Sequence, residues 1–138
     1  MGHKPIILAA CLVLAAGAPA LAHHSFAMFD NAKVMSLDGT VKALEWVNPH
    51  SWIHIATVNS AGKAEEWAFE MGGPGQLSGQ GWTRNSVKVG DKITVTFHPM
   101  KDGSHGGSEM SVKLADGTVL GGRGGFFGGR GPAPRFNR

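Results

Sequence analysis

Hydrophobic and polar residues alternate along the middle of the chain, which predicts short β-strands. The clearest example is the segment 93–97, where three apolar residues alternate with two threonines. A period of two residues places one set of side chains on a buried face and the other on a wet face. The segments 52–58 and 65–71 alternate in the same way and are separated by a hairpin signal at 59–62.

Weaker patterns extend this series of elements on both sides. A long extended segment at 34–46 precedes the hairpin, and Gly39 inside it indicates a bend or a bulge. Glycines and a proline interrupt the pattern after the third strand, and the segment 76–81 is compatible with a short, glycine-weakened helix. Alternation returns at 110–114, and a turn then leads to a short closing strand at 118–120.

This order of elements predicts a mainly β fold, a small five-stranded OB-like barrel with one short helix. Three strands, a helix and two further strands, with a bent first strand, suit such a barrel. Ile53 and Ile55 should share its buried face, and Trp67 and Phe69 should lie on the dry face of the third strand. A β-sandwich is the alternative, although it usually needs about seven strands.

Residues 1–22 have the composition of a secretory signal peptide. A short basic start is followed by an apolar run at 6–18 and by the small residues Ala20 and Ala22. The apolar run is shorter than the roughly 20 residues of a membrane-spanning helix. Cys11 follows a sequence like that of a lipoprotein, but the apolar run continues past it, which favours soluble export. We expect cleavage after Ala22 and a periplasmic or secreted protein.

The rest of the chain divides into one domain at 23–120 and a tail at 121–138. Between residues 23 and 120, eight lysines and arginines face ten aspartates and glutamates, whereas the tail carries four arginines and no acid. The formal charge of +3 therefore reflects mainly the tail, and we expect no nucleic-acid partner for the domain. The glycine-, arginine- and phenylalanine-rich tail should be disordered and touch anionic surfaces weakly. Because Cys11 is the only cysteine, the mature chain should form no disulfide.

Two histidines, His23 and His24, directly follow the expected cleavage site. Cleavage after Ala22 would place the new α-amine beside two imidazoles, a set of nitrogen ligands suited to copper, with zinc and nickel as alternatives. Cleavage after Leu21 would instead make His24 the third residue, the position for a square-planar copper or nickel site. In the simpler interpretation, the two histidines only give the mature chain an accessible polar start and bind no metal.

A second constellation lies within the domain, at residues 48–54. In an extended strand His50, Trp52 and His54 project to one side. His50 and His54 are candidates to complete a metal site with the N-terminal histidines, although sharing an ion would require them to lean inward or recruit another strand. Trp52 is a candidate contact for a protein, peptide or glycan. In the simpler interpretation, His50 caps the turn and His54 is an ordinary exposed residue.

Glu66 and Glu70 lie on one side of the strand at 65–71, a pairing that hydrolases use for acid and base roles. No nucleophile motif, phosphate loop or H-E-x-x-H sequence accompanies them. We therefore favour a non-catalytic protein, in which these carboxylates solvate the exposed side of the strand or pair with lysines.

Several spaced residues together resemble a known sequence family. They are His23-His24-Ser25-Phe26-Ala27-Met28-Phe29-Asp30, Gly39-Thr40-Val41, Trp46-x-Asn48-Pro49-His50-x-Trp52-Ile53, Glu66-Trp67-x-x-Glu70, Leu77, Gly81-Trp82 and Gly90-Asp91. This pattern, within a domain from His23 to about Leu120, resembles domain-of-unknown-function family 6152, a family of exported bacterial proteins. The resemblance implies a soluble periplasmic protein without an established activity, and residues from Gly121 onward lie outside it.

These observations together predict a non-catalytic periplasmic binding protein. Its first candidate ligand is copper, held by His23 and His24 with help from His50 or His54. The alternative is an interaction module that binds a protein or a small ligand of the cell envelope without metal. In that case an aromatic barrel face containing Trp52 would make the contact.

Overall fold

The computed structural model describes residues 26–122. Its elements follow the chain in this order: η1 Phe26–Met28, β1 Met35–Glu45, β2 Trp52–Val58, β3 Ala64–Glu70, α1 Pro74–Gly79, β4 Lys92–Pro99, β5 Gly106–Leu114 and β6 Val119–Gly121. The expected signal peptide and most of the expected tail lie outside the described residues.

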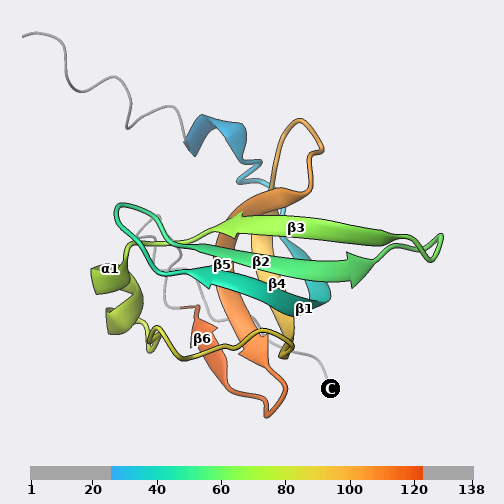
Figure 1. The fold of residues 1–138 in the computed structure, drawn as a ribbon. Coiled ribbons are helices and arrows are strands. Elements are labelled where there is room, and N and C mark those ends of the chain that lie inside the picture. The colour runs from blue at the N-terminus through green and yellow to red at the C-terminus, as the bar shows by residue number, and fades with distance from the viewer. Residues whose placement is uncertain (1–25, 123–138) are drawn as a thin grey trace, which may run out of the picture.

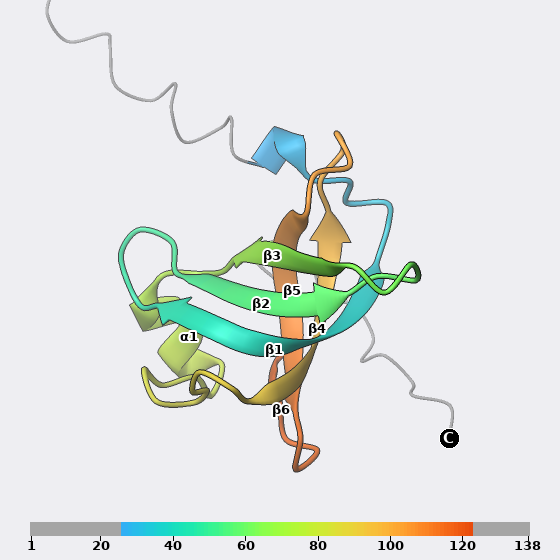
Figure 2. The same ribbon diagram turned by 45° about the vertical axis from the view of Figure 1, so that its right-hand side comes forward.

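Five strands close into a barrel (Figure 1, Figure 2). β1 pairs with β2 and β4, β2 pairs with β3, and β4 pairs with β5, all in antiparallel fashion. β3 and β5 then pair in parallel, with Ala68 opposite Gly106 and Glu70 opposite Ser108, which completes the circle. β6 adds a short antiparallel edge to β5. The expected mainly β, OB-like barrel with one short helix is therefore confirmed.

β1 is long and curved because it takes part in both halves of the barrel (Figure 2). Its first half pairs with β4 and its second half with β2, and Thr40 pairs with both strands. A Cβ atom at Gly39 would lie 2.6 Å from Ile55 Cδ1, so glycine permits the close approach of β1 to β2. The bulge lies farther along, just before Ala43. Beyond this bulge, Leu44 packs against the core.

The barrel interior is apolar, as the alternation predicts. Ile53, Ile55 and Phe69 are all 0% exposed, whereas Trp67 is only partly buried and packs against the core from one side. α1 begins at Pro74, two residues before the expected helix, because proline fits the first turn of a helix. The other buried members of this core are Val41, Met71, Leu77, Trp82, Val87, Ile93, Val95, Phe97, Val112 and Leu120.

β5 begins earlier than the sequence predicts. We expected it to start at Met110, but Gly106 and Gly107 already pair with β3 and belong to the strand. A Cβ atom at Gly106 would lie 2.8 Å from the Ala68 carbonyl oxygen, and one at Gly107 would collide with the His98 carbonyl. Glycines that resemble a turn in the sequence thus permit the close strand contact that closes the barrel.

Candidate functional site

Trp52 and His54 project from the outer face of the barrel. Both belong to β2, where they alternate with Ile53 and Ile55, which are fully buried. Because successive strand residues point to opposite faces, this burial fixes the direction of the indole and the imidazole. Both side chains remain partly accessible to solvent. β2 has hydrogen-bonded neighbours on both sides, so this part of the surface rests on regular sheet.

Trp52 lies in a row of three side chains that crosses the sheet. Its partners are Glu45 on β1 and Glu70 on β3, and directly opposite side chains in an antiparallel pair have Cβ atoms about 5 Å apart. The next row along the strands places His54 between two small residues on β1 and β3. We call these two rows the Trp52 face: Glu45, Trp52, Glu70, Ala43, His54 and Ala68.

A histidine–carboxylate pair joins the Trp52 face to the loop between β1 and β2. His50 Nδ1 contacts Glu70 Oε1, and the Glu70 side chain is only 7% exposed. The same loop also packs on the entrance to α1, because a Cβ atom at Gly73 would lie 2.7 Å from the Pro49 carbonyl oxygen. His50 therefore pairs with a nearly buried carboxylate at the place where the loop, β3 and the helix entrance meet.

A second histidine–carboxylate pair lies on the surface beside Trp52. His54 Nε2 and Glu45 Oε1 are 2.9 Å apart, and Glu45 is 53% exposed. The carboxylate that contacts His54 is also the neighbour of Trp52 in the row described above. The indole thus has an acidic side chain on each side, and each of these side chains contacts a histidine.

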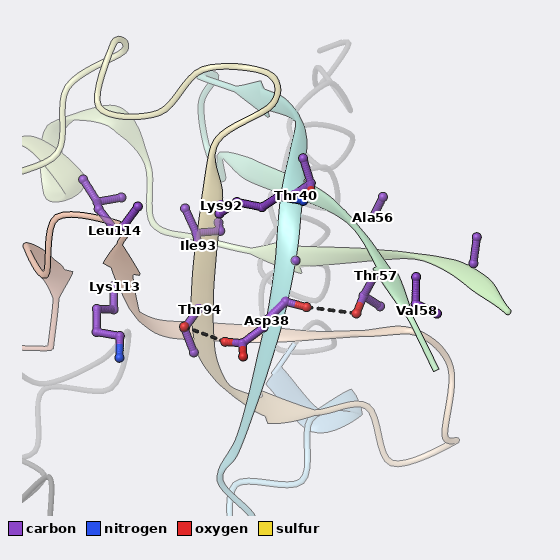
Figure 3. A pocket seen from close by; sticks show the side chains of 13 residues that line it. Asp38, Thr40, Ala56, Thr57, Val58, Lys92, Ile93, Thr94, Lys113 and Leu114 are labelled. Carbon is purple, nitrogen blue, oxygen red and sulfur yellow. Dashed lines mark hydrogen bonds between the residues drawn. The ribbon is translucent and has the colours of Figure 1, made fainter. Parts of the chain in front are cut away.

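A groove lies on another part of the barrel, over β1, β4 and the ends of β2 and β5 (Figure 3). It measures about 620 Å³, and its lining includes Asp38, Thr40, Lys92, Thr94 and Lys113. Thr94 Oγ1 donates to Asp38 Oδ1 over 2.6 Å, and Lys92 Nζ donates to Thr40 Oγ1 over 2.6 Å. Several of the polar side chains that line the groove thus form hydrogen bonds with one another. No residue of the Trp52 face lines the groove.

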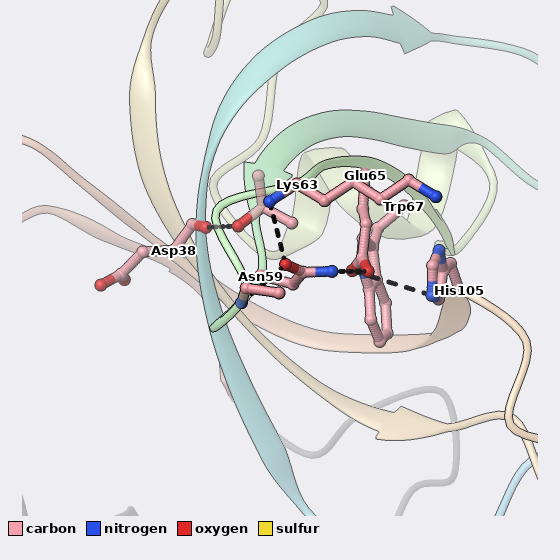
Figure 4. Close-up of polar contacts among 8 residues, drawn as sticks. Asp38, Asn59, Lys63, Glu65, Trp67 and His105 are labelled. Carbon is pink, nitrogen blue, oxygen red and sulfur yellow. Dashed lines mark hydrogen bonds and ion pairs between the residues drawn. The ribbon is translucent and has the colours of Figure 1, made fainter.

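Another polar cluster ties the β2–β3 hairpin to the loop before β5 (Figure 4). His105 stacks on Trp67 with ring centroids 4.8 Å apart, and its Nε2 lies 3.7 Å from Glu65 Oε2. Asn59 Nδ2 donates to Glu65 Oε1 over 2.6 Å, and this hydrogen bond is the main cause that lowers the pKa of Glu65. Sequence reasoning missed the cluster because no local pattern connects Trp67 with His105.

The comparison with known sequence families matches residues 10–109, most of the chain, to a family described as a family of unknown function (DUF6152). The chain belongs to domain-of-unknown-function family 6152. This confirms the resemblance, although the matched range ends at Glu109 instead of reaching Leu120. No curated protein and no solved structure matches the chain. Membership in family 6152 assigns no activity to the chain.

The histidines of this family 6152 protein that we predicted as metal ligands fall into two groups. His23 and His24 lie outside the described residues, so the terminal site stays a prediction. His50 lies in the loop before β2 and His54 lies within β2, and each contacts its own carboxylate. Within residues 26–122, no group of three or more histidine, cysteine, aspartate or glutamate side chains is arranged to hold a metal ion.

The two carboxylates that suggested acid–base chemistry have different surroundings. Glu66 is exposed, whereas Glu70 is buried and contacts His50. The expectation that both carboxylates would solvate the strand or pair with lysines is therefore wrong for Glu70. The family 6152 chain instead uses Glu70 to hold the loop beside Trp52.

Across residues 26–122, no helix has the length and hydrophobicity needed to cross a membrane.

Proposed function

We propose that the protein is an exported, non-catalytic binding protein of the cell envelope that holds its ligand on the Trp52 face. One observation carries this proposal: a partly exposed indole lies between carboxylates on both neighbouring strands. Export is supported by the signal-type sequence at residues 1–22.

A tryptophan in this setting is suited to binding. Its large ring supplies contact area with few rotatable bonds, which is why tryptophan is common among the residues that dominate interfaces. Pairing of β2 with β1 and β3 fixes the backbone of Trp52 before any ligand arrives. Binding therefore requires little ordering of the protein, which preserves affinity.

The test is capture of ligands from envelope extract by the full mature chain in the presence of a chelator. Trp52→Ala should abolish specific capture. The matched control is Val58→Ala, which removes another apolar side chain from β2 at a position that is 64% exposed, and it should leave capture unchanged. Equal capture by the wild type and Trp52→Ala would remove the basis of the proposal.

Copper binding at the mature N-terminus is a second candidate function. The chain that follows His24 is held on the barrel: Lys101 Nζ donates to the Ala27 carbonyl over 2.8 Å, and the Lys101 amide donates to the Met28 carbonyl over 2.9 Å. His24 lies three residues before Ala27, so no more than about 11 Å of chain separates it from this anchor. The proposed ligands are the α-amine, His23 and His24, with His50 or His54 as helpers.

Elemental analysis of the mature protein should then find about one equivalent of copper after exposure to the metal. The double variant His23→Ala with His24→Ala should lose it, whereas His98→Ala should retain it. Undiminished copper in the double variant would contradict a terminal site and would leave the proposal for the Trp52 face untouched.

A further inference from the structure

We infer that the Trp52 face recognises the guanidinium group of an arginine-bearing partner peptide. This inference rests on the proposed function, because it names the chemistry of a ligand for the same surface. It is carried by the charge and shape of three consecutive rows of side chains across β1, β2 and β3.

The two rows nearest Trp52 contain two glutamates and no lysine or arginine, whereas the third row meets Lys92 Nζ of β4, which donates to Thr40 Oγ1. The first contains Glu45, Trp52 and Glu70, and the third adds Glu66 opposite Ala56. The full set of paired positions is Glu45, Trp52, Glu70, Ala43, His54, Ala68, Thr40, Ala56 and Glu66, without a lysine or an arginine. Lys42, which is exposed, falls in the bulge of β1 between the second and third rows and has no pairing partner in β2. A cation that approaches Trp52 therefore meets carboxylates on both sides.

The shape of the middle row gives such a cation room. His54 has Ala43 on one side and Ala68 on the other, so the surface next to Trp52 is bordered by methyl groups. Large side chains at these two positions would cover the indole from the neighbouring strands. A flat group can instead lie beside the ring and still reach a carboxylate.

Guanidinium fits these surroundings better than an ammonium or a neutral sugar. It is planar, stacks on indole, and donates two parallel hydrogen bonds to one carboxylate. Glu45 is the carboxylate within reach of solvent, with 53% of its side chain exposed. A carboxylate has about four acceptor positions, so Glu45 can contact His54 and a guanidinium group together. Glu70, which is 7% exposed, adds negative charge from below the surface.

In the test, the full mature chain is titrated with acetyl-Gly-Arg-Gly-amide. The chemical shift of the Trp52 indole N–H is followed by NMR. The control peptide carries citrulline, which has the shape of arginine without its charge. The arginine peptide should shift the resonance to saturation, and the citrulline peptide should bind about tenfold more weakly or worse. Equal binding of the two peptides would overturn the inference.

Two variants of the protein separate a specific carboxylate from overall charge. Glu45→Gln should weaken arginine-peptide binding about tenfold. Asp38→Asn removes the same charge from the same strand but from the groove of Figure 3, and it should leave binding unchanged. Equal weakening by both variants would overturn the inference.

The capture experiment distinguishes failure of this inference from failure of the proposed function. If the arginine peptide does not bind but Trp52→Ala still abolishes capture from envelope extract, the guanidinium inference is wrong and the Trp52 face remains a binding site. If Trp52→Ala affects neither measurement, both are wrong.

Discussion

The side chain of Glu109 is a carboxyl group that is buried in the barrel wall. It lies on β5 opposite Phe97 and is 6% exposed. Its Oε1 atom has no hydrogen-bond partner within residues 26–122, and burial raises its pKa to about 8. A Cβ atom at Gly121 would lie 3.1 Å from this oxygen, so the glycine at the end of β6 allows the chain to pack closely over the carboxyl.

The stability of the protein should therefore fall as the pH rises across the neutral range. The folded-state pKa of Glu109, about 8, lies above its ordinary value of 4.5, so the folded state retains a proton that the unfolded state has released. The contribution of Glu109 to the free energy of unfolding is fully present below about pH 4.5. Between about pH 4.5 and pH 8 it decreases by about 1.4 kcal/mol per pH unit. Glu109→Gln should remove this slope. Urea unfolding of both proteins at several pH values measures it, and equal slopes would contradict a neutral Glu109.

At the scale of elements, the two histidine–carboxylate pairs have different places. His50 connects the loop between β1 and β2 to Glu70 of β3, whereas His54 and Glu45 pair on the exposed outer face of the sheet. Glu70 is 7% exposed and Glu45 is 53% exposed. The two histidine–carboxylate contacts should therefore contribute differently to stability, because a carboxylate that loses its partner is rehydrated easily only at the surface.

His50→Ala should lower the free energy of unfolding by about 3 kcal/mol, since it removes a partner from a buried carboxylate. His54→Ala should lower it by about 0–1 kcal/mol, as is usual for an exposed pair. Urea denaturation midpoints of the two variants give the comparison. A larger loss in His54→Ala would show that the loop is not fastened through Glu70.

Most strands could be predicted from the sequence: β2, β3 and β4 from clear alternation, and β1 and β6 from weaker patterns. β2, β3 and β4 follow from residues such as Ile53, Phe69 and Val95, whose burial depends only on local periodicity. The first half of β5 could not be predicted, because Gly106 and Gly107 also form turns and their pairing partner is distant in the chain.

The candidate site could be predicted only along one strand. Alternation placed Trp52 and His54 on one side of β2, and the structure agrees. The carboxylates beside them come from other strands, and the register that brings Glu45 and Glu70 to Trp52 depends on the bulge in β1 and on the hairpin between β2 and β3. Such register is a property of the assembled sheet and leaves no mark in the sequence of one strand.

At the scale of the whole molecule, the closed barrel presents the proposed binding surface on its outer side, and Glu109 is buried in its wall. Barrel closure by β3 and β5 shortens the free sheet edges, which limits self-association through strand pairing. Location in the cell envelope is a separate prediction, and a different measurement tests it.

Intact-mass and N-terminal analysis of the exported protein should find a chain that begins at His23. The small residues Ala20 and Ala22 precede this position, as a signal peptidase requires. Protein recovered outside the cytoplasm with Met1 still present would contradict cleavage, and a start at Ala22 would change the geometry proposed for copper.

The most direct test of the central claim is photo-cross-linking in cells that produce the protein. A photoreactive residue in place of His54 should give a specific cross-linked product, and Trp52→Ala in the same chain should abolish it. The same photoreactive residue in place of Lys113, in the groove of Figure 3, should give no such product. We predict cross-linking that is confined to the Trp52 face and depends on the indole. The same product from both positions, or a product that survives Trp52→Ala, would contradict it.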